Sequence, residues 1–297
     1  MVNINSSIDT ASLVALAREA GEAILTIYNA DKLLDLQLKE DDSPLTAADL
    51  AANQVLLRGL PAIADIPIIS EENPLPELSV RRQWPRYWLL DPLDGTKEFI
   101  QRNGEFTVNI ALIEQGSAVL GVVHVPVSDV TYVGVNPVDG PKRAIKYTAA
   151  DEPKILQVRA LQEAYQQQRA VTSLVSHRHG AEALVGLMNH LQQAWPGPLT
   201  SISAGSSLKF CLVAEGSADF YPRLAPTSEW DTAAAQAVLE AAGGAVVEAE
   251  AFDQGRWIPL TYNARPQILN PSFYALGDSS FDWLNFLYRK APNPAKG

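Results

Sequence analysis

Short apolar runs that stop abruptly at charged residues, Gly or Pro constrain this chain more than any other feature of its sequence. Residues 66–69, 87–90, 106–113 and 118–125 are mainly apolar runs of this kind. Their length and their boundaries favour β-strands over helices. Residues 114–117, Glu-Gln-Gly-Ser, separate the last two runs and predict a hairpin. The first half of the chain is therefore expected to contain a sheet.

Helical periodicity flanks these strands and returns in the second half. Residues 11–28 repeat apolar side chains at steps of three and four, and a second helix is expected over residues 46–60. In the second half, the expected elements are a strand over 170–175 and helices over 181–193, 206–215 and 232–242. Alternating strands and helices predict an α/β layer.

The chain length and one irregular segment predict two domains. The sequence has 297 residues, and domains average about 150 residues. Residues 136–152 are rich in Pro, Gly and charged side chains and show no clear periodicity. We therefore expect a junction here, with an α+β domain over residues 1–150 and an α/β domain over residues 151–297.

Charge and cysteine content exclude some classes of function. The chain has 23 Lys and Arg and 34 Asp and Glu residues, and this net charge of −11 argues against a broad basic face for nucleic-acid polymers. The single cysteine, Cys211, rules out an intrachain disulfide and is expected to be a small buried side chain. Residues 1–11 lack the pattern of a secretory signal, and no apolar run reaches the ~20 residues that span a bilayer. A cytoplasmic protein is the expectation.

Two aspartates lie in one tight turn directly after the strand expected over residues 87–90. Residues 91–96 read Asp-Pro-Leu-Asp-Gly-Thr, in which the proline fixes one backbone angle and Gly95 permits a sharp bend. The carboxylates of Asp91 and Asp94 could thus converge with the intervening carbonyl into an oxygen cage for a hard divalent cation. A plain surface turn is the alternative on this segment alone.

Four segments together resemble the signatures of the inositol monophosphatase superfamily of metal-dependent, lithium-sensitive phosphatases. They are residues 46–49 (Thr-Ala-Ala-Asp), 70–72 (Ser-Glu-Glu), 91–96, and 230–234 (Trp-Asp-Thr-Ala-Ala) with Ala-Gly-Gly at 242–244. The resemblance covers residues 13–274 and weakens over residues 136–168. It implies an α/β (α+β) fold, the layered α/β/α/β/α sandwich of sugar phosphatases, with the metal site between its halves.

Two further segments are similar to 3′(2′),5′-bisphosphate nucleotidases of the bacterial CysQ type. These are residues 96–112, which begin Thr-Lys-Glu-Phe-Ile, and residues 205–216, which begin Gly-Ser-Ser-Leu-Lys. Inositol phosphatases usually carry other residues in place of Lys97 and Glu98. The resemblance implies hydrolysis of adenosine 3′,5′-bisphosphate to AMP and phosphate, action on 3′-phosphoadenylyl sulfate, and inhibition by Li⁺ and Ca²⁺.

The same resemblance implies a metal centre with two or three Mg²⁺ ions. Glu71, Asp91 and the Leu93 carbonyl would hold one ion. Asp91 would bridge to a second ion, which Asp94 and Asp231 also hold. Two cations about 3.5–4 Å apart clamp the attacking and leaving oxygens of a phosphoryl displacement. The alternative for Asp231 is a carboxylate at the N-cap or in the first turn of a helix, where the helix dipole stabilises its charge.

A second group of residues would activate the attacking water. By the resemblance, the Thr96 hydroxyl and the Asp49 carboxylate relay a proton from a metal-bound water, and Glu71 belongs to the same catalytic set. The alternative for Asp49 is a helix-capping acid, since it lies three residues after Thr46. Both roles are compatible.

Substrate contacts are expected around the same centre. The residues expected to contact the substrate are Glu71, Leu93, Asp94, Gly95, Thr96, Ser206, Lys209, Asp231, His179 and Arg223. Backbone amides of Gly95 and Thr96 would bind the scissile phosphate. Ser206, Ser207 and Lys209 open a predicted helix whose free amides favour a phosphate, and Lys209 would neutralise the second phosphate. The alternative is an ordinary serine cap with a solvated lysine. His179 would stack on adenine, unless it lies in a plain surface loop.

The C-terminal residues depart from the family pattern. Residues 278–297 include an aromatic-rich stretch at 281–288 that is too short to span a membrane. Packing back on the protein is the favoured interpretation. Peripheral contact with the inner membrane or with a second subunit are the alternatives, and both a monomer and a homodimer stay open.

Two other functions also stay open. An inositol or sugar monophosphatase of the same fold is disfavoured by Lys97 and Glu98 and by residues 205–209. A catalytically silent nucleotide-binding regulator is disfavoured by the presence of Asp49, Glu71, Asp91, Asp94 and Asp231 together, because a binding module has no need of a water-activating pair. The expected partner is a small nucleotide bisphosphate.

Overall fold

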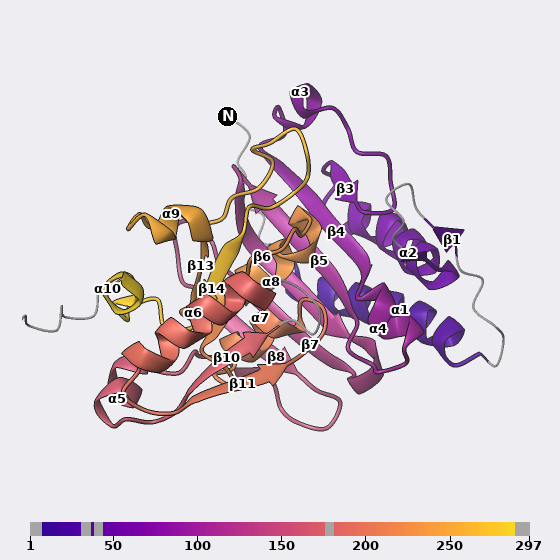
Figure 1. Cartoon of the computed structure of the whole chain (residues 1–297). Coiled ribbons are helices and arrows are strands. Elements are labelled where there is room, and N and C mark those ends of the chain that lie inside the picture. Colours follow the sequence, from indigo (N-terminus) through magenta and orange to yellow (C-terminus); the bar gives the residue numbers. More distant parts are fainter. Residues whose placement is uncertain (1–7, 31–36, 39–43, 176–180, 289–297) are drawn as a thin grey trace, which may run out of the picture.

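The computed structural model describes residues 8–30, 37–38, 44–175 and 181–288, which form two large sheets with helices around them (Figure 1). The elements of the first half are α1 (Thr10–Tyr28), β1 (Gln37–Leu38), β2 (Pro44–Leu45), α2 (Ala47–Ile63), β3 (Ile68–Ser70), α3 (Leu78–Arg81), β4 (Arg86–Asp94), α4 (Thr96–Ile100), β5 (Thr107–Glu114), β6 (Ser117–Val125), η1 (Pro126–Ser128), β7 (Val130–Val135), β8 (Arg143–Tyr147) and β9 (Lys154–Ile155). Those of the second half are α5 (Leu161–Gln166), β10 (Val171–Val175), α6 (Ala181–Ala194), β11 (Leu199–Ser203), α7 (Leu208–Ala214), β12 (Phe220–Arg223), η2 (Glu229–Asp231), α8 (Ala233–Ala241), β13 (Ala245–Glu248), α9 (Ala249–Asp253), β14 (Phe273–Leu276) and α10 (Trp283–Tyr288).

The seven-stranded sheet has the order β3-β4-β5-β6-β7-β8-β9. Strand β3 pairs with β4 in parallel, and the other neighbours are antiparallel, so the hairpin predicted over residues 106–125 is confirmed as β5 and β6. Trp88 and Leu90 of β4 pack against α1 and α2, whereas Tyr87 and Leu89 belong to the core on the opposite face. Both faces of the sheet are buried, which explains why its strands read as nearly continuous apolar runs.

The five-stranded sheet, with the order β11-β10-β12-β14-β13, completes a layered arrangement. Helices α7 and α8 lie between the two sheets, because their apolar residues belong to one core with residues of both. Helices α5, α6, α9 and α10 cover the other face of the five-stranded sheet (Figure 1). With α1 and α2 on the far side of the seven-stranded sheet, the expected α/β/α/β/α sandwich is confirmed.

Helix α8 packs directly on the backbone of the seven-stranded sheet because small residues meet there. A Cβ on Gly121 in β6 would lie 1.9 Å from the Ala234 carbonyl oxygen. A Cβ on Gly134 in β7 would lie 2.4 Å from Val238 Cα. Larger residues at these positions would push α8 away, so the two glycines fix the helix that follows Asp231.

The expectation of an irregular junction over residues 136–152 was wrong in one respect. Strand β8 lies within this segment and pairs with β7, and Ala144 and Ile145 are buried in it. Two apolar residues among charged ones are too few to show the alternation that marks a strand. Strand β9 extends the same sheet to Ile155, and a domain division near residue 150 stays a prediction.

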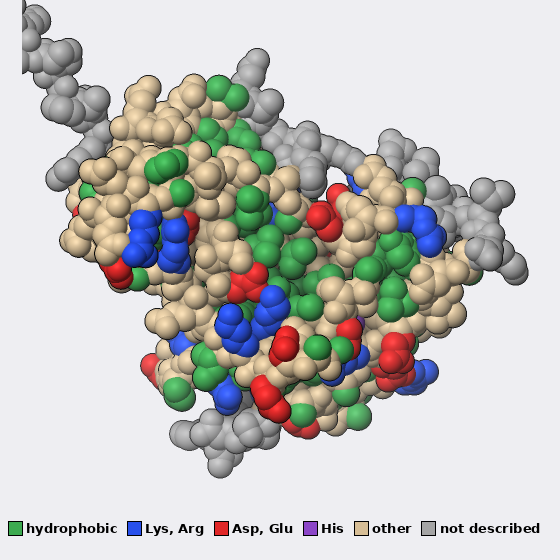
Figure 2. Space-filling model, turned by 90° about the horizontal axis from the view of Figure 1, so that it is seen from below, with side chains coloured by type: hydrophobic (Ala, Val, Ile, Leu, Met, Phe, Trp, Pro, Cys, Tyr) green, Lys and Arg blue, Asp and Glu red, His purple; other side chains and the backbone are tan. Residues whose placement is uncertain are grey.

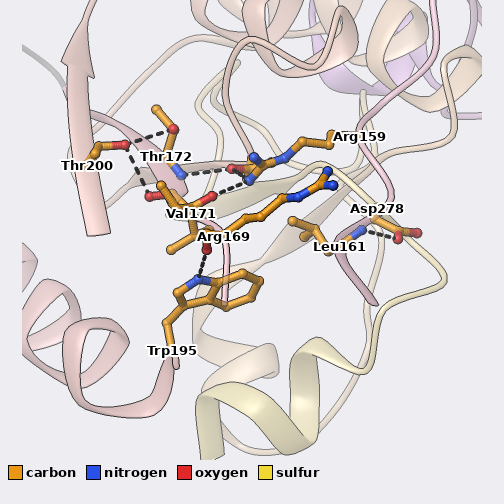
Figure 3. Close-up of polar contacts among 10 residues, drawn as sticks. Arg159, Leu161, Arg169, Val171, Thr172, Trp195, Thr200 and Asp278 are labelled. Atoms are coloured by element: carbon orange, nitrogen blue, oxygen red, sulfur yellow. Dashed lines mark hydrogen bonds and ion pairs between the residues drawn. The ribbon is translucent and has the colours of Figure 1, made fainter. Parts of the chain in front are cut away.

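The described part of the C-terminal tail packs on the outer face of the five-stranded sheet. The apolar residues between 281 and 287 share a core with Trp195, whose Nε1 donates to the Arg169 carbonyl at 2.7 Å. Beside this core, the Leu161 amide donates to Asp278 at 2.9 Å (Figure 3). Packing back on the protein is thus confirmed for the described residues of the tail, and residues 289–297 lie outside them.

The described surface shows no marked separation of charge on the face seen in Figure 2, where Lys and Arg side chains lie in small groups beside Asp and Glu. Among the described helices, none is long and apolar enough to cross a bilayer. Cys211 is buried in α7, as predicted.

Candidate active site

Three aspartates from two distant parts of the chain converge on one point. Asp91 and Asp94 lie at the end of β4, and Asp231 ends the 3₁₀-helix η2, just before α8. One carboxylate oxygen from each of the three lies within 4.8 Å of the other two. The fold therefore brings together side chains that are 137 positions apart or more in sequence.

The turn at the end of β4 follows from its residue order. Pairing with β5 becomes irregular between Asp91 and Asp94, where the intervening proline has no amide hydrogen to donate. The Leu93 amide donates to Asp91 Oδ1 at 3.0 Å, and Gly95 adopts a φ of +95°. A Cβ on Gly95 would also lie 3.3 Å from Ser206 Cβ, so glycine serves both the turn and this close approach.

Burial and mutual repulsion make these carboxylates hard to ionise together. Burial raises the pKa of Asp91 well above its usual value, and the charges of Glu71 and the other two aspartates raise it further. Burial likewise raises the pKa of Asp94 and of Asp231. A hard divalent cation prefers oxygen ligands and would offset this repulsion. The donor set, three carboxylates with Glu71 beside them, therefore fits a hard divalent cation.

Glu71 is held beside the aspartates by the end of β3. Its amide donates to the Leu90 carbonyl at 3.2 Å, which continues the pairing of β3 with β4. Ser70 and Asn73, which flank Glu71 in the chain, both bond to Asn53 of α2. Asn53 accepts from Ser70 Oγ at 2.7 Å and donates to Asn73 Oδ1 at 2.8 Å. Helix α2 thus fixes both flanks of Glu71.

Asp49 contacts both the start of α2 and Thr96. Its Oδ2 accepts from the Thr46 amide at 2.8 Å and from the Thr46 hydroxyl at 2.6 Å, which forms a capping box. Thr96 Oγ1 donates to Asp49 Oδ1 at 3.4 Å. The capping alternative is confirmed, and it coexists with the Thr96 contact because each uses a different carboxylate oxygen.

Ser207 holds Asp94 in place, a role that the sequence did not predict. Its amide and hydroxyl lie 2.6 and 2.7 Å from Asp94 Oδ2, and Asn109 Nδ2 donates to its Oγ at 2.8 Å. The helix expected from Ser206 begins instead at Leu208, because Ser206 has a φ of +43°. That part of the prediction was wrong, since the Ser207 amide serves Asp94 rather than a free helix start.

A pocket of about 150 Å³ opens beside the aspartates. Its wall is built from segments on both sides of the site and includes Lys97, Ser206, Lys209, Tyr221, Arg223 and Thr227. Asp94 and Asp231 also line it, so the pocket is continuous with the acidic cluster. A ligand held there would lie directly against the candidate metal site.

Lys209 is buried in the wall of this pocket, so the alternative of a solvated lysine was wrong. Its Nζ donates to the carbonyls of Ala204 and Ser206 at 3.1 and 2.9 Å and lies 5.4 Å from the centre of the Tyr221 ring. Burial lowers the pKa of Lys209 to about 8, and the nearby Asp94 charge opposes that shift. Lys209 therefore remains mainly protonated at neutral pH.

Two further residues, Arg223 and His179, were expected to contact the substrate, and the structure places only Arg223. Arg223 ends β12, lines the pocket and donates to the Pro226 carbonyl at 3.1 Å. His179 lies outside the described residues, and its contact with adenine stays a prediction. Among the residues that sequence reasoning missed, Asn53 alone carried a local signal, because it follows Asp49 by one helical turn.

Comparisons with known proteins identify the family to which this chain belongs. Residues 6–275 match the inositol monophosphatase family. The 3′(2′),5′-bisphosphate nucleotidase CysQ of Shigella flexneri is 49% identical over 259 residues, which cover 87% of this chain and 95% of that protein. The CysQ of Escherichia coli strain K12 is 48% identical with the same coverage. The crystal structure of CysQ from Bacteroides thetaiotaomicron, a bacterial member of the inositol monophosphatase family, is 37% identical, has a TM-score of 0.73, and covers 92% of this chain and 99% of that chain. Because the family match spans most of the sequence, this chain belongs to the inositol monophosphatase family.

Proposed function

We propose that the chain is a Mg²⁺-dependent 3′(2′),5′-bisphosphate nucleotidase that hydrolyses adenosine 3′,5′-bisphosphate to AMP and phosphate. The observation that carries this proposal is the convergence of Asp91, Asp94 and Asp231 beside a pocket with Lys209 and Arg223 in its wall. The carboxylates suit a cation, and the two basic side chains suit an anionic substrate. The names of the relatives that are 48–49% identical support the same choice.

The acidic side chains would hold the metal. Asp91, Asp94 and Asp231 offer one oxygen each to a common point, and we assign Glu71 and the Leu93 carbonyl to the same centre of two or three Mg²⁺ ions. When bound, the ions would polarise the phosphoryl group and lower the pKa of the attacking water. The carboxylates would set the positions of the ions, with Asp91 buried and Asp94 and Asp231 facing the pocket.

Thr96 and Asp49 would take the proton of the attacking water. The Thr96 hydroxyl already donates to Asp49 Oδ1, so a proton accepted at the hydroxyl can pass to the carboxylate. Thr46 holds the other oxygen of Asp49 and so keeps the carboxylate aimed at Thr96. The amides of Gly95 and Thr96, at the start of α4, are the proposed donors to the scissile phosphate.

The second phosphate of the substrate would bind at Lys209. An ammonium group has three donors, and the Ala204 and Ser206 carbonyls occupy two of them, which leaves one for a ligand. Arg223 supplies a second positive charge in the same wall. An inositol monophosphate has no second phosphate to use these charges, so they favour a bisphosphate.

An inositol or sugar monophosphatase is the second candidate, because the family match carries that description. The test is the initial rate of phosphate release from adenosine 3′,5′-bisphosphate, 3′-phosphoadenylyl sulfate and inositol 1-phosphate, each with Mg²⁺, with EDTA, and with Mg²⁺ plus Li⁺. We expect the first substrate to be preferred, EDTA to abolish release, and Li⁺ to inhibit it. Faster turnover of inositol 1-phosphate would favour the second candidate.

Two variants make this test specific to the site. Asp91→Asn should release no phosphate from any substrate, because it removes a buried carboxylate of the metal centre. Asp65→Asn is the matched control, because Asp65 is exposed, and it should behave as wild type. Wild-type protein that binds the nucleotide with Mg²⁺ and releases no phosphate would instead be a silent nucleotide-binding regulator.

A further inference from the structure

Arg81 is a fully buried arginine that the proposed chemistry does not use. It ends α3 and has an exposed fraction of 0%. Arginine is almost never buried to this extent unless its donors are paired. Its position in the chain also matters, because α3 lies in the connection between β3 and β4 that begins at Glu71.

The guanidinium binds one short segment of the other half of the chain. Nη1 donates to Asn263 Oδ1 at 2.5 Å, and Nη2 donates to the Arg265 and Pro266 carbonyls at 2.8 and 2.5 Å. Asn263 Nδ2 donates back to the Arg81 carbonyl at 2.7 Å. Arg81 alone thus makes four hydrogen bonds to residues that lie 182 to 185 positions away.

The same segment holds the 3₁₀-helix that carries Asp231. The Asn263 amide donates to Glu229 Oε2 at 2.8 Å, and the Glu229 amide donates to the Ile268 carbonyl at 2.8 Å. Glu229 is itself 0% exposed. Because η2 is a single short turn, its position depends on these external bonds rather than on its own length.

We propose that Arg81 is a positioning residue, which sets the place of the Asp231 carboxylate through Asn263 and thereby the affinity of the site for a divalent cation. The inference rests on the proposed function, because it takes the acidic cluster to be a metal centre. Residues that orient metal ligands from behind typically contribute ten- to a hundredfold in metal affinity. Loss of the Arg81 contacts would leave the carboxylates present and their geometry altered.

The experiment titrates Mg²⁺ into full-length Arg81→Lys, with Arg82→Gln as the matched control. Lysine keeps the charge of Arg81 and lacks the planar fork that reaches four acceptors, namely the Pro76 carbonyl and the three acceptors at residues 263–266. Arg82 is the next residue, is exposed, and donates one bond to the Ala264 carbonyl at 2.9 Å. Mg²⁺ binding is measured by calorimetry without substrate, and the Mg²⁺ dependence of phosphate release is measured separately.

For Arg81→Lys we expect the Mg²⁺ dissociation constant and the half-saturating Mg²⁺ concentration to rise together by about tenfold. The kcat at saturating Mg²⁺ should stay within about threefold of wild type, and Arg82→Gln should match wild type in both measurements. Unchanged Mg²⁺ affinity in Arg81→Lys would overturn the proposal whatever happens to its melting temperature. A fall in kcat that saturating Mg²⁺ does not restore would overturn it as well.

A second variant serves if Arg81→Lys does not fold. Asn263→Gly suits the observed φ of +59° and keeps the amide that binds Glu229, and it removes both side-chain bonds to Arg81. The same rise in the Mg²⁺ dissociation constant is expected, and wild-type affinity would overturn the proposal. Wild-type protein that binds Mg²⁺ without releasing phosphate would refute the proposed function and leave this comparison of affinities intact.

Discussion

Gly121→Ala should displace helix α8 and, with it, one side of the proposed metal centre. The added Cβ would lie 1.9 Å from the Ala234 carbonyl oxygen, and such contacts are essentially never shorter than 3.0 Å. Strand β6 and α8 must therefore separate by about 1 Å, because both contacting groups are backbone and cannot rotate away. Ala234 lies three residues after Asp231, so the displacement reaches that carboxylate.

The size of both effects follows from this displacement. Overpacking a core by one methyl group typically costs about 1–3 kcal/mol, and the absence of a flexible neighbour places Gly121→Ala near the upper end. A misplacement of about 1 Å costs on the order of a hundredfold in rate. We therefore expect the free energy of unfolding to fall by about 3 kcal/mol. We expect kcat/KM for the bisphosphate to fall by about a hundredfold.

Urea unfolding followed by tryptophan fluorescence and initial rates of phosphate release measure the two effects. Gly186→Ala is the matched control, because Gly186 is an exposed residue of helix α6 and its added Cβ would meet nothing within 4 Å. The control should gain about 0.5–1 kcal/mol, as alanine favours the helix, and should keep full activity. Wild-type stability and turnover in Gly121→Ala would refute the placement of α8 against β6.

Three further changes test individual contacts. Asp94→Asn should abolish phosphate release yet raise the melting temperature of the metal-free protein. Burial raises the pKa of Asp94, so its charge is unfavourable in the fold, and asparagine removes that charge and still accepts from Ser207. A lower melting temperature would contradict this. Burial lowers the pKa of His124 from 6.5 to about 4, so between these pH values the unfolded chain binds a proton that the folded chain does not. The free energy of unfolding should therefore rise by up to about 3 kcal/mol as the pH increases from about 4 to 6.5. Urea unfolding of His124→Gln should show a correspondingly flatter pH dependence, and an unchanged one would refute the assignment. Lys209→Met should raise KM for the bisphosphate by about tenfold or more, because a charged hydrogen bond is lost; an equal rise for inositol 1-phosphate would exclude contact with the second phosphate.

The features that could be predicted from the sequence are those that short segments encode. The run over residues 87–90 predicted β4 because burial on both faces leaves a continuous apolar run. The spacing of Asp91 and Asp94 predicted their convergence because proline and glycine constrain the turn between and after them. Asp231 could be joined to them through the family resemblance, since nothing local links it to β4.

The features that escaped prediction depend on contacts between distant segments. Ser207 binds Asp94 across 113 positions, and the contact requires a positive φ at Ser206 that serine rarely adopts. Arg81 looks like an ordinary surface residue in sequence, and its burial follows from pairing with Asn263 across 182 positions. Strand β8 was missed because only pairing with β7 distinguishes it from a charged loop.

The most direct measurement of the central claim is an anomalous difference map from a crystal of the protein soaked with Mn²⁺ as a stand-in for Mg²⁺. A metal held by the acidic cluster should give a peak within about 2.5 Å of carboxylate oxygens of Asp91, Asp94 and Asp231 together. Absence of a peak there at a Mn²⁺ concentration that supports phosphate release would contradict the account, because the activity would then depend on some other site.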